Sequence, residues 1–142
     1  MFEKMIKYFK KYKEVLMYLI FGLLTTLISL LVYYILTLTV LNVEKIFELQ
    51  FANVVSWLIG VLFAYITNRK YVFDSKNKSK IKEFCSFLSS RVITLVMDMV
   101  IMYVGVSLLM VNDKLVKLIS QTIVIISNYF FSKLFVFKVK KI

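Results

Sequence analysis

Residues 15–41 read VLMYLIFGLLTTLISLLVYYILTLTVL and contain no charged side chain. About 20 apolar residues in a helix cross the hydrocarbon core of a bilayer, so this stretch is long enough to span a membrane. Similar apolar stretches occupy about 51–68, 87–111 and 115–137. The sequence therefore predicts an all-α polytopic membrane protein with four transmembrane helices.

The composition of the whole chain agrees with this prediction. Its 142 residues are 61% hydrophobic and include no proline and three glycines. Soluble domains are about 45–50% apolar, and a β or α/β fold would need more turn residues. We expect a single membrane domain over residues 1–142. The absence of histidine and the single cysteine, Cys85, predict no disulfide within the chain, no His/Cys metal site and no cofactor.

The net charge of +11 is concentrated at the ends of the apolar stretches. Membrane lipids are therefore the expected partners of these bases, and nucleic acid is not. The bases cluster in residues 1–14, in the loop 69–86 and at Lys133, Lys138, Lys140 and Lys141. The connections 42–50 and 112–114 carry few bases. The positive-inside rule then places both termini and the loop 69–86 in the cytoplasm, with the protein in the cytoplasmic (inner) membrane.

Residues 1–14 have an amphipathic pattern. Apolar side chains recur at helical spacing among the lysines, namely Phe2, Met5, Ile6 and Phe9. This pattern predicts an interfacial amphipathic helix on the inner leaflet, and membrane anchoring is its simplest role.

The two halves of the chain resemble each other. A shift of 64 residues places the second span on the fourth, so that Tyr65 meets Tyr129 and Arg69 meets Lys133. A shift of 69 places the first span on the third. Both copies end in an aromatic residue followed by Val-Phe, with a base upstream. The sequence thus predicts two tandem two-helix repeats that enter the membrane in the same sense.

Each predicted span carries small or polar residues at helical spacing. The second has Asn53, Ser56, Gly60, Ala64 and Thr67. Such faces are typical of helix packing in membranes, which is one interpretation. The other is a polar pathway through the bundle, with the candidate residues Thr25, Ser29, Asn68, Asp98, Gln121 and Asn128.

The third span differs because it contains Arg91 and Asp98. An Asp near mid-membrane costs roughly 2.5–3.5 kcal/mol on insertion scales, so it needs a polar partner. Seven residues of helix separate the two by about 10 Å, too far for a direct pair. Asp98 is therefore expected to find its partner on another helix, and the candidates are Thr25, Ser29, Asn68, Gln121 and Asn128. Arg91 either snorkels to the interface or acts as a clamp for phosphate together with Arg69, Lys70 and Lys133.

The motifs resemble those of the GtrA-like family of four-helix membrane proteins over about residues 15–138. They are Phe21-Gly22 followed by Thr25 or Thr26, the run Asn68-Arg69-Lys70-Tyr71-Val72-Phe73, the span-opening Arg91, and Asn128 with Lys133–Phe137. Ser132-Lys133 stands where the family pattern has Asn-Arg, which weakens the expectation of a bidentate base in the second copy.

This resemblance implies a role in building cell-surface polysaccharides. Proteins of the family are thought to flip a sugar linked to undecaprenyl phosphate across the cytoplasmic membrane. Teichoic acid glycosylation in a Gram-positive cell is the preferred acceptor pathway, because the chain is rich in lysine and nothing points to an outer membrane.

Two interpretations of this role remain open. The protein is either such a flippase or a non-transport accessory subunit that anchors or stabilises a membrane glycosyltransferase. Its expected partners are the polyprenyl-phosphate-linked sugar, membrane lipids, a membrane glycosyltransferase and, in a homo-oligomer, further copies of itself. The sequence has no nucleophile or phosphate-binding motif, so we expect no enzymatic activity and no catalytic residue.

Overall fold

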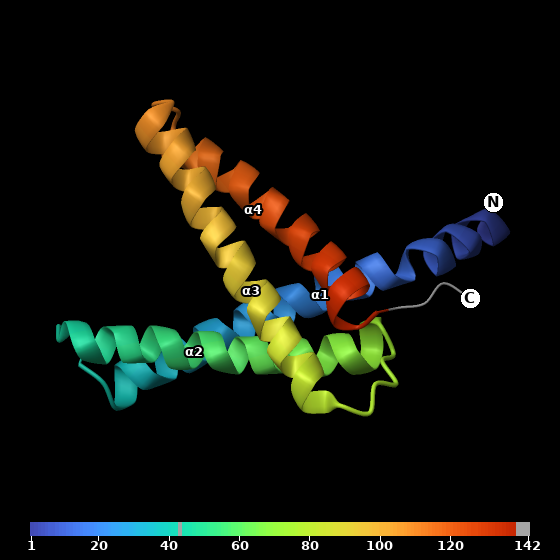
Figure 1. Cartoon of the computed structure of the whole chain (residues 1–142), viewed down its shortest axis with the longest axis horizontal. Helices are drawn as coiled ribbons and strands as arrows, with labels where there is room; N and C mark the ends of the chain where they lie inside the picture. Colours follow the sequence, from blue (N-terminus) through green and yellow to red (C-terminus); the bar gives the residue numbers. More distant parts are fainter. Residues whose placement is uncertain (43, 139–142) are drawn as a thin grey trace. The chain divides into compact units, whose positions relative to one another are not determined.

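The computed structural model describes residues 1–42 and 44–138, and its long helices are α1 (Phe2–Thr39), α2 (Ile46–Thr67), α3 (Lys80–Met102) and α4 (Asp113–Phe131) (Figure 1). Short π-helical turns follow three of them: η1 (Asn68–Val72), η2 (Tyr103–Leu108) and η3 (Ser132–Val136). The described residues contain no strand. Lys140 and Lys141, counted among the basic residues of the sequence, lie outside the described part of the chain.

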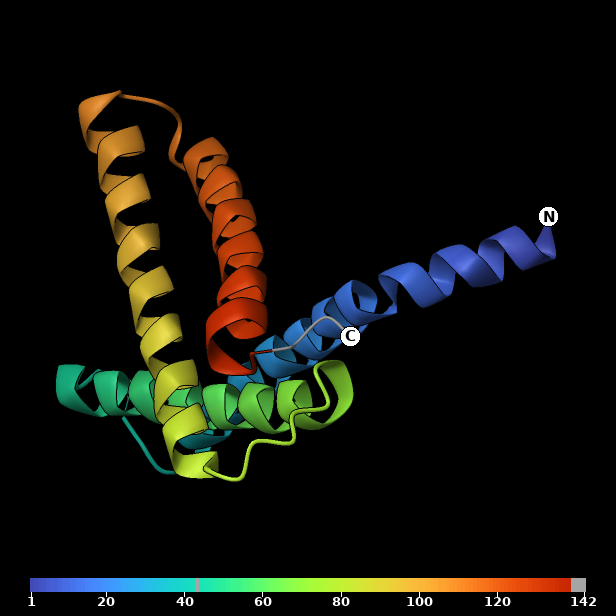
Figure 2. The same cartoon turned by 45° about the vertical axis from the view of Figure 1, so that its right-hand side comes forward.

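The chain divides into two compact units. Unit 1 comprises Met1–Asp74, and unit 2 begins at Ser75. In unit 1, α1 packs along α2, and η1, which continues α2, also contacts α1. In unit 2, α3 packs along α4, and η3, which continues α4, also contacts α3. Each unit is therefore an antiparallel helical hairpin (Figure 2).

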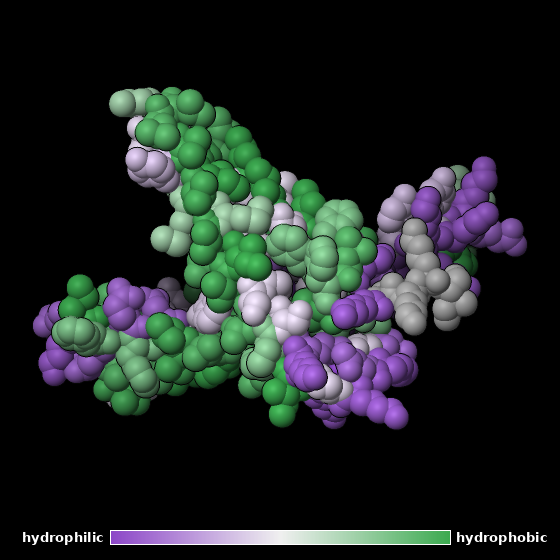
Figure 3. All heavy atoms as spheres, viewed as in Figure 1, coloured by the Kyte–Doolittle hydropathy of each residue, from purple (hydrophilic) through white to green (hydrophobic). Residues whose placement is uncertain are grey.

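Each of the four helical segments is long and apolar enough to cross a membrane. The hairpins bury little of their apolar surface: Tyr18 is the buried residue of α1, whereas Leu23, Leu31 and Leu38 are 69%, 60% and 81% exposed. Hydrophobic residues cover the middle of the helices, and hydrophilic ones gather toward helix ends (Figure 3). A soluble monomer rarely exposes apolar patches of this extent. The chain is a multi-pass membrane protein, with lipid as the solvent of its apolar faces.

The helix boundaries extend beyond the predicted spans. The N-terminal amphipathic segment is helical as expected, but it continues into the first span as one helix, α1, without a break. α2 begins at Ile46 rather than at 51, and α3 begins at Lys80 rather than at 87. The loop 69–86 is consequently shortened, with only residues 73–79 lying between η1 and α3. Backbone hydrogen bonding is satisfied within a helix in water and in lipid alike, so hydropathy does not fix where a helix ends.

A line of small and polar residues, spaced four apart, holds each hairpin together. In α2 and η1 the buried members are Ala52, Ser56, Gly60, Ala64 and Asn68. In α4 and η3 they are Val116, Ser120, Asn128, Ser132 and Val136, with the half-buried Val124 at the position between Ser120 and Asn128. Residues four apart lie on one helix face, and small side chains there let two helices approach closely in lipid. Asn53, expected on this face, is exposed, and Ala52 takes that position.

The predicted repeat is confirmed by these two lines and by the way each hairpin ends. Adding 64 to Ala52, Ser56, Ala64 and Asn68 gives Val116, Ser120, Asn128 and Ser132, so four positions of the two lines coincide, while Gly60 corresponds to the half-buried Val124. Phe73 follows η1 and packs on Tyr18, with ring centroids 6.4 Å apart. Phe137 follows η3 and packs on Phe87 at 6.0 Å.

The backbone after each of these turns also repeats. Asp74 has φ of 43° and Lys138 has φ of 42°, both in the left-handed region. The two positions differ by the same 64 residues. The aromatic-Val-Phe ending of each copy is thus a structural device that turns the chain and attaches it to the first helix of its own hairpin.

Close approach of α1 and α2 depends on Gly60. A Cβ atom at this position would overlap Ser29 Oγ and would lie 3.6 Å from Thr25 Cγ2. Replacing Gly60 by Leu should therefore force the two helices apart and lower the free energy of unfolding by about 1–3 kcal/mol, the usual cost of overpacking. Denaturation in mixed micelles, followed by circular dichroism, measures this loss.

Gly22 provides the matched control, because a Cβ there meets nothing within 4 Å. Gly22→Leu should leave the unfolding free energy within about 0.5 kcal/mol of wild type, as surface substitutions usually do. Equal losses in the two variants would show that Gly60 does not set the helix spacing.

Candidate functional site

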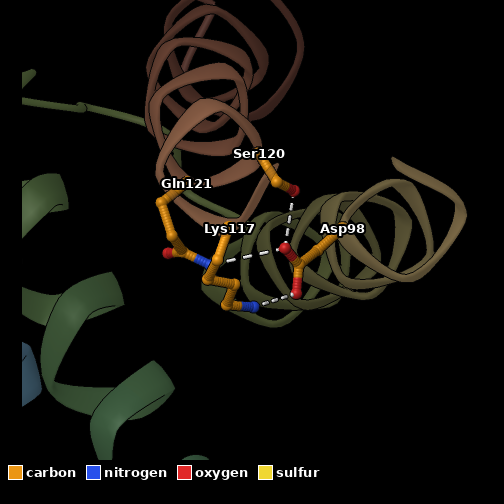
Figure 4. Close-up of polar contacts among 4 residues, drawn as sticks. All are labelled: Asp98, Lys117, Ser120 and Gln121. Carbon is orange, nitrogen blue, oxygen red and sulfur yellow. Dashed lines mark hydrogen bonds and ion pairs between the residues drawn. The ribbon is translucent and has the colours of Figure 1, made fainter. Parts of the chain in front are cut away.

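Three side chains of α4 converge on the carboxylate of Asp98 in α3 (Figure 4). Lys117 Nζ donates to Oδ2 at 2.7 Å, Ser120 Oγ donates to Oδ1 at 2.6 Å, and Gln121 Nε2 donates to Oδ1 at 3.4 Å. The side chain of Asp98 is 16% exposed and that of Lys117 is 47% exposed. An acidic group inside a predicted span is thereby matched by one cation and two further donors, which offsets much of its desolvation. We call these four residues the Asp98 cluster.

The sequence predicted part of this arrangement. It required a partner for Asp98 on another helix and offered Thr25, Ser29, Asn68, Gln121 and Asn128. Of these, Gln121 contacts Asp98. Lys117 and Ser120 were not among the candidates. Ser120 and Gln121 follow Lys117 by three and four residues, which puts all three on one face of α4, and this signal could have identified them.

Asn128 makes a different contact within unit 2. Its Oδ1 accepts a hydrogen bond of 2.8 Å from Thr94 Oγ1, and both side chains are buried. Thr94 lies one turn before Asp98 on α3. The helices α3 and α4 are therefore joined by polar contacts at two neighbouring places, the Asp98 cluster and the Thr94–Asn128 pair.

A groove lies beside the Asp98 cluster in unit 2. It has a volume of about 470 Å³ and is lined by Met102, Asp113, Lys114, Lys117, Leu118 and Gln121. It shares Lys117 and Gln121 with the cluster. Asp113 opens α4 after the cap residue Asn112, so the groove lies near the 109–112 connection of the hairpin.

The opposite end of each hairpin carries a base that pairs with a tyrosine one turn earlier. In unit 1, Arg69 Nη1 lies 3.5 Å from the Tyr65 hydroxyl. In unit 2, Lys133 Nζ lies 3.2 Å from the Tyr129 hydroxyl. The two pairs are related by the 64-residue shift. Lys70, next to Arg69, lies over the ring of Tyr71 at 5.1 Å.

Arg91 has no counterpart in unit 1, where the 69-residue shift gives Gly22. Its guanidinium carbon lies 4.5 Å from the centroid of Phe87, the ring that packs on Phe137. Arg91 and Lys133 thus belong to the same end of unit 2, whereas Arg69 and Lys70 belong to unit 1. Convergence of all four bases on one phosphate stays a prediction.

A buried polar atom precedes the base in each copy. Asn68 Oδ1 and Ser132 Oγ are buried, and neither has a hydrogen-bond partner among residues 1–42 and 44–138. The two residues are again related by the shift of 64. Buried polar atoms are nearly always hydrogen-bonded, so the two unpaired atoms are a further feature that the two copies share.

Thr25 and Ser29 lie on the face of α1 that meets α2. Thr25 Oγ1 donates to the carbonyl of Phe21 at 2.8 Å, a bond within its own helix. Ser29 packs beside Gly60. Their part in a polar pathway stays a prediction.

Comparison with known families supports the resemblance seen in the motifs. The family described as GtrA/DPMS, transmembrane domain, matches residues 17–137. The chain belongs to this family. The matched region begins inside α1, after the N-terminal amphipathic segment, and takes in the apolar parts of the four long helices and both aromatic-Val-Phe endings.

Curated relatives match over nearly the whole chain. The chain is 37% identical over 142 residues to the cell wall teichoic acid glycosylation protein GtcA of Listeria monocytogenes serovar 1/2a, covering 98% of this chain and 94% of the relative. It is 39% identical to the protein of the same name from Listeria innocua, with the same coverage. It is 38% identical over 128 residues to the uncharacterized membrane protein YwcD of Bacillus subtilis, covering 88% of this chain and 97% of that protein. No solved structure matches the chain.

The Asp98–Lys117 pair should contribute to the stability of unit 2. Lys117→Met leaves the carboxylate without its cation and should lower the unfolding free energy by about 1–2 kcal/mol, less than for a fully buried pair because Lys117 is partly exposed. Asp98→Asn in the Lys117→Met background should restore most of this loss, since the amide needs no counter-charge. Mixed-micelle denaturation of the single and double variants measures the coupling. Additive losses would contradict the pairing.

Proposed function

We propose that this protein moves an undecaprenyl-phosphate-linked sugar across the cytoplasmic membrane for glycosylation of a cell-surface polysaccharide, in this case cell wall teichoic acid. The observation that carries the proposal is the Asp98 cluster, a charged and hydrogen-bonding group inside a membrane span. Intramembrane ionisable residues commonly mark the path of a polar substrate. The choice of cell wall teichoic acid as the polymer rests on the relatives that are named for teichoic acid glycosylation.

The basic ends of the hairpins suit the first step, which is capture of the carrier's phosphate. Arg69 and Lys133 are each held against a tyrosine hydroxyl, and Arg91 is held against an aromatic ring. Side chains fixed in this way lose less conformational freedom when they bind an anion. Arginine adds a planar fork that matches two phosphate oxygens.

The polar contacts of unit 2 suit the second step, which is passage of the sugar. Arg91, the Thr94–Asn128 pair and the Asp98 cluster follow one another along α3. A sugar hydroxyl can exchange hydrogen bonds with such groups in turn, while the polyprenyl chain stays among lipid tails. Movement then runs down the carrier's own gradient, and the protein makes and breaks no covalent bond.

The charge distribution supports an orientation with both termini and residues 73–79 in the cytoplasm. A membrane glycosyltransferase on the same side charges the carrier that this protein takes up. The hairpins expose apolar faces that a second copy or the transferase can cover, and neither nucleic acid nor a cofactor has a part in this function.

Reconstituted wild-type protein should move a labelled polyprenyl-phosphate sugar from one leaflet of a liposome to the other. Arg91→Ala should lower the initial rate by about tenfold or more, the effect of losing a charge-assisted contact. The measurement is the fraction of label that an enzyme outside the liposome can reach over time.

Lys78→Ala is the matched control, because it removes the same charge from an exposed residue between η1 and α3. It should transport like wild type. Liposomes in which wild type moves no label would contradict the proposal. If deletion of the protein also abolished glycosyltransferase activity in isolated membranes, the accessory-subunit interpretation would replace it.

Cys85 reports the orientation directly, because it is the single cysteine and is exposed. A membrane-impermeant maleimide should not label Cys85 in intact cells and should label it after permeabilisation. Met110→Cys in a Cys85→Ser background, at the exposed 109–112 connection, should already be labelled in intact cells. Labelling of Cys85 in intact cells would reverse the proposed orientation.

A further inference from the structure

The groove beside the Asp98 cluster is shallow and open, and it is large enough to hold part of a small molecule. Its volume of about 470 Å³ falls within the roughly 300–1,000 Å³ of ligand pockets. It lies at the end of unit 2 remote from Arg91 and Lys133, where α4 begins. A head group that enters at the basic end and travels along α3 would therefore meet this groove after the Asp98 cluster.

The charges of the groove and its neighbouring cluster balance. Lys114 and Lys117 bring two positive charges, and Asp98 and Asp113 bring two negative ones. Lys117 is already held by Asp98 at 2.7 Å. A phosphate would face no net attraction here, in contrast to the basic ends of the hairpins. The charge balance favours a neutral ligand.

The chemistry of the lining specifies that ligand further. Gln121 offers an amide that both donates and accepts hydrogen bonds, and the lysines donate while the carboxylates accept. Met102 and Leu118 line the same groove with apolar surface. A pyranose presents a rim of hydroxyl groups and an apolar C–H face, which matches this mixture.

We infer that this groove is a binding site for the sugar moiety of the cargo, separate from the contacts to its phosphate. The inference rests on the proposed function and deepens it: the groove, rather than the basic ends, distinguishes a loaded carrier from a bare one. Gln121 is the specificity-determining residue, because its amide lines the groove and also bonds to Asp98.

Saturation-transfer NMR with the full chain in nanodiscs tests the site itself. The probes are methyl glucoside and methyl N-acetylglucosaminide as neutral sugars, with glycerol phosphate as the anionic comparison. At least one glycoside should show a saturable signal, and glycerol phosphate should not compete for it. Leu118→Trp, which fills the groove, and Gln121→Leu should each weaken glycoside binding by about tenfold or more.

Thr122→Leu is the matched control, since Thr122 adjoins Gln121, is exposed, and its hydroxyl bonds to the carbonyl of Leu118 in its own helix. It should bind the glycoside like wild type. Competition by glycerol phosphate, unchanged binding in both groove variants, or no saturable signal from either sugar in wild type would overturn the inference.

A transport assay distinguishes failure of this inference from failure of the proposed function. In liposomes, Gln121→Leu should slow the sugar-loaded carrier about tenfold and leave bare polyprenyl phosphate at its wild-type rate. Equal slowing of both carriers, or of neither, would overturn the sugar site while leaving translocation intact. Failure of wild type to move the loaded carrier would remove the proposed function itself.

Discussion

A bilayer offers no water to polar groups, so those inside the membrane must be satisfied by the protein or by its cargo. Each hairpin meets this constraint with one line of small and polar residues spaced four apart, from Ala52 to Asn68 and from Val116 to Val136. The line brings the two helices of a unit close together and leaves their leucines and isoleucines to the lipid.

The two hairpins share one arrangement of helices but differ in the residues at corresponding positions. Where unit 1 has Ala64 on its line, unit 2 has Asn128, which bonds to Thr94. Where unit 1 has Ser29 beside Gly60, the corresponding position in unit 2 is Asp98, held by Lys117 and Ser120. Unit 1 is thus the closely packed copy and unit 2 is the polar copy.

The sequence predicted the helical class, the apolar spans and the tandem repeat, because hydropathy and internal similarity are properties of the chain itself. It also required a partner for Asp98, because an isolated carboxylate in lipid is costly. The sequence did not identify Lys117 as this partner, because a lysine near the start of an apolar span is expected to face the membrane surface. Its long side chain instead reaches Asp98 from α4. Helix starts at Ile46 and Lys80 were missed for a related reason, since a helix continues beyond the hydrocarbon core wherever its own backbone is paired.

The central claim is that the polar residues peculiar to unit 2 carry the cargo. Replacing Asp98 by Ser and Asn128 by Ala gives unit 2 the residues that unit 1 has at the corresponding positions. Leaflet-to-leaflet transfer of a labelled polyprenyl-phosphate sugar in liposomes is the direct measurement, with circular dichroism to verify that the helices are retained. The account predicts a folded protein that no longer moves the loaded carrier. Transfer at the wild-type rate by this folded variant would contradict it.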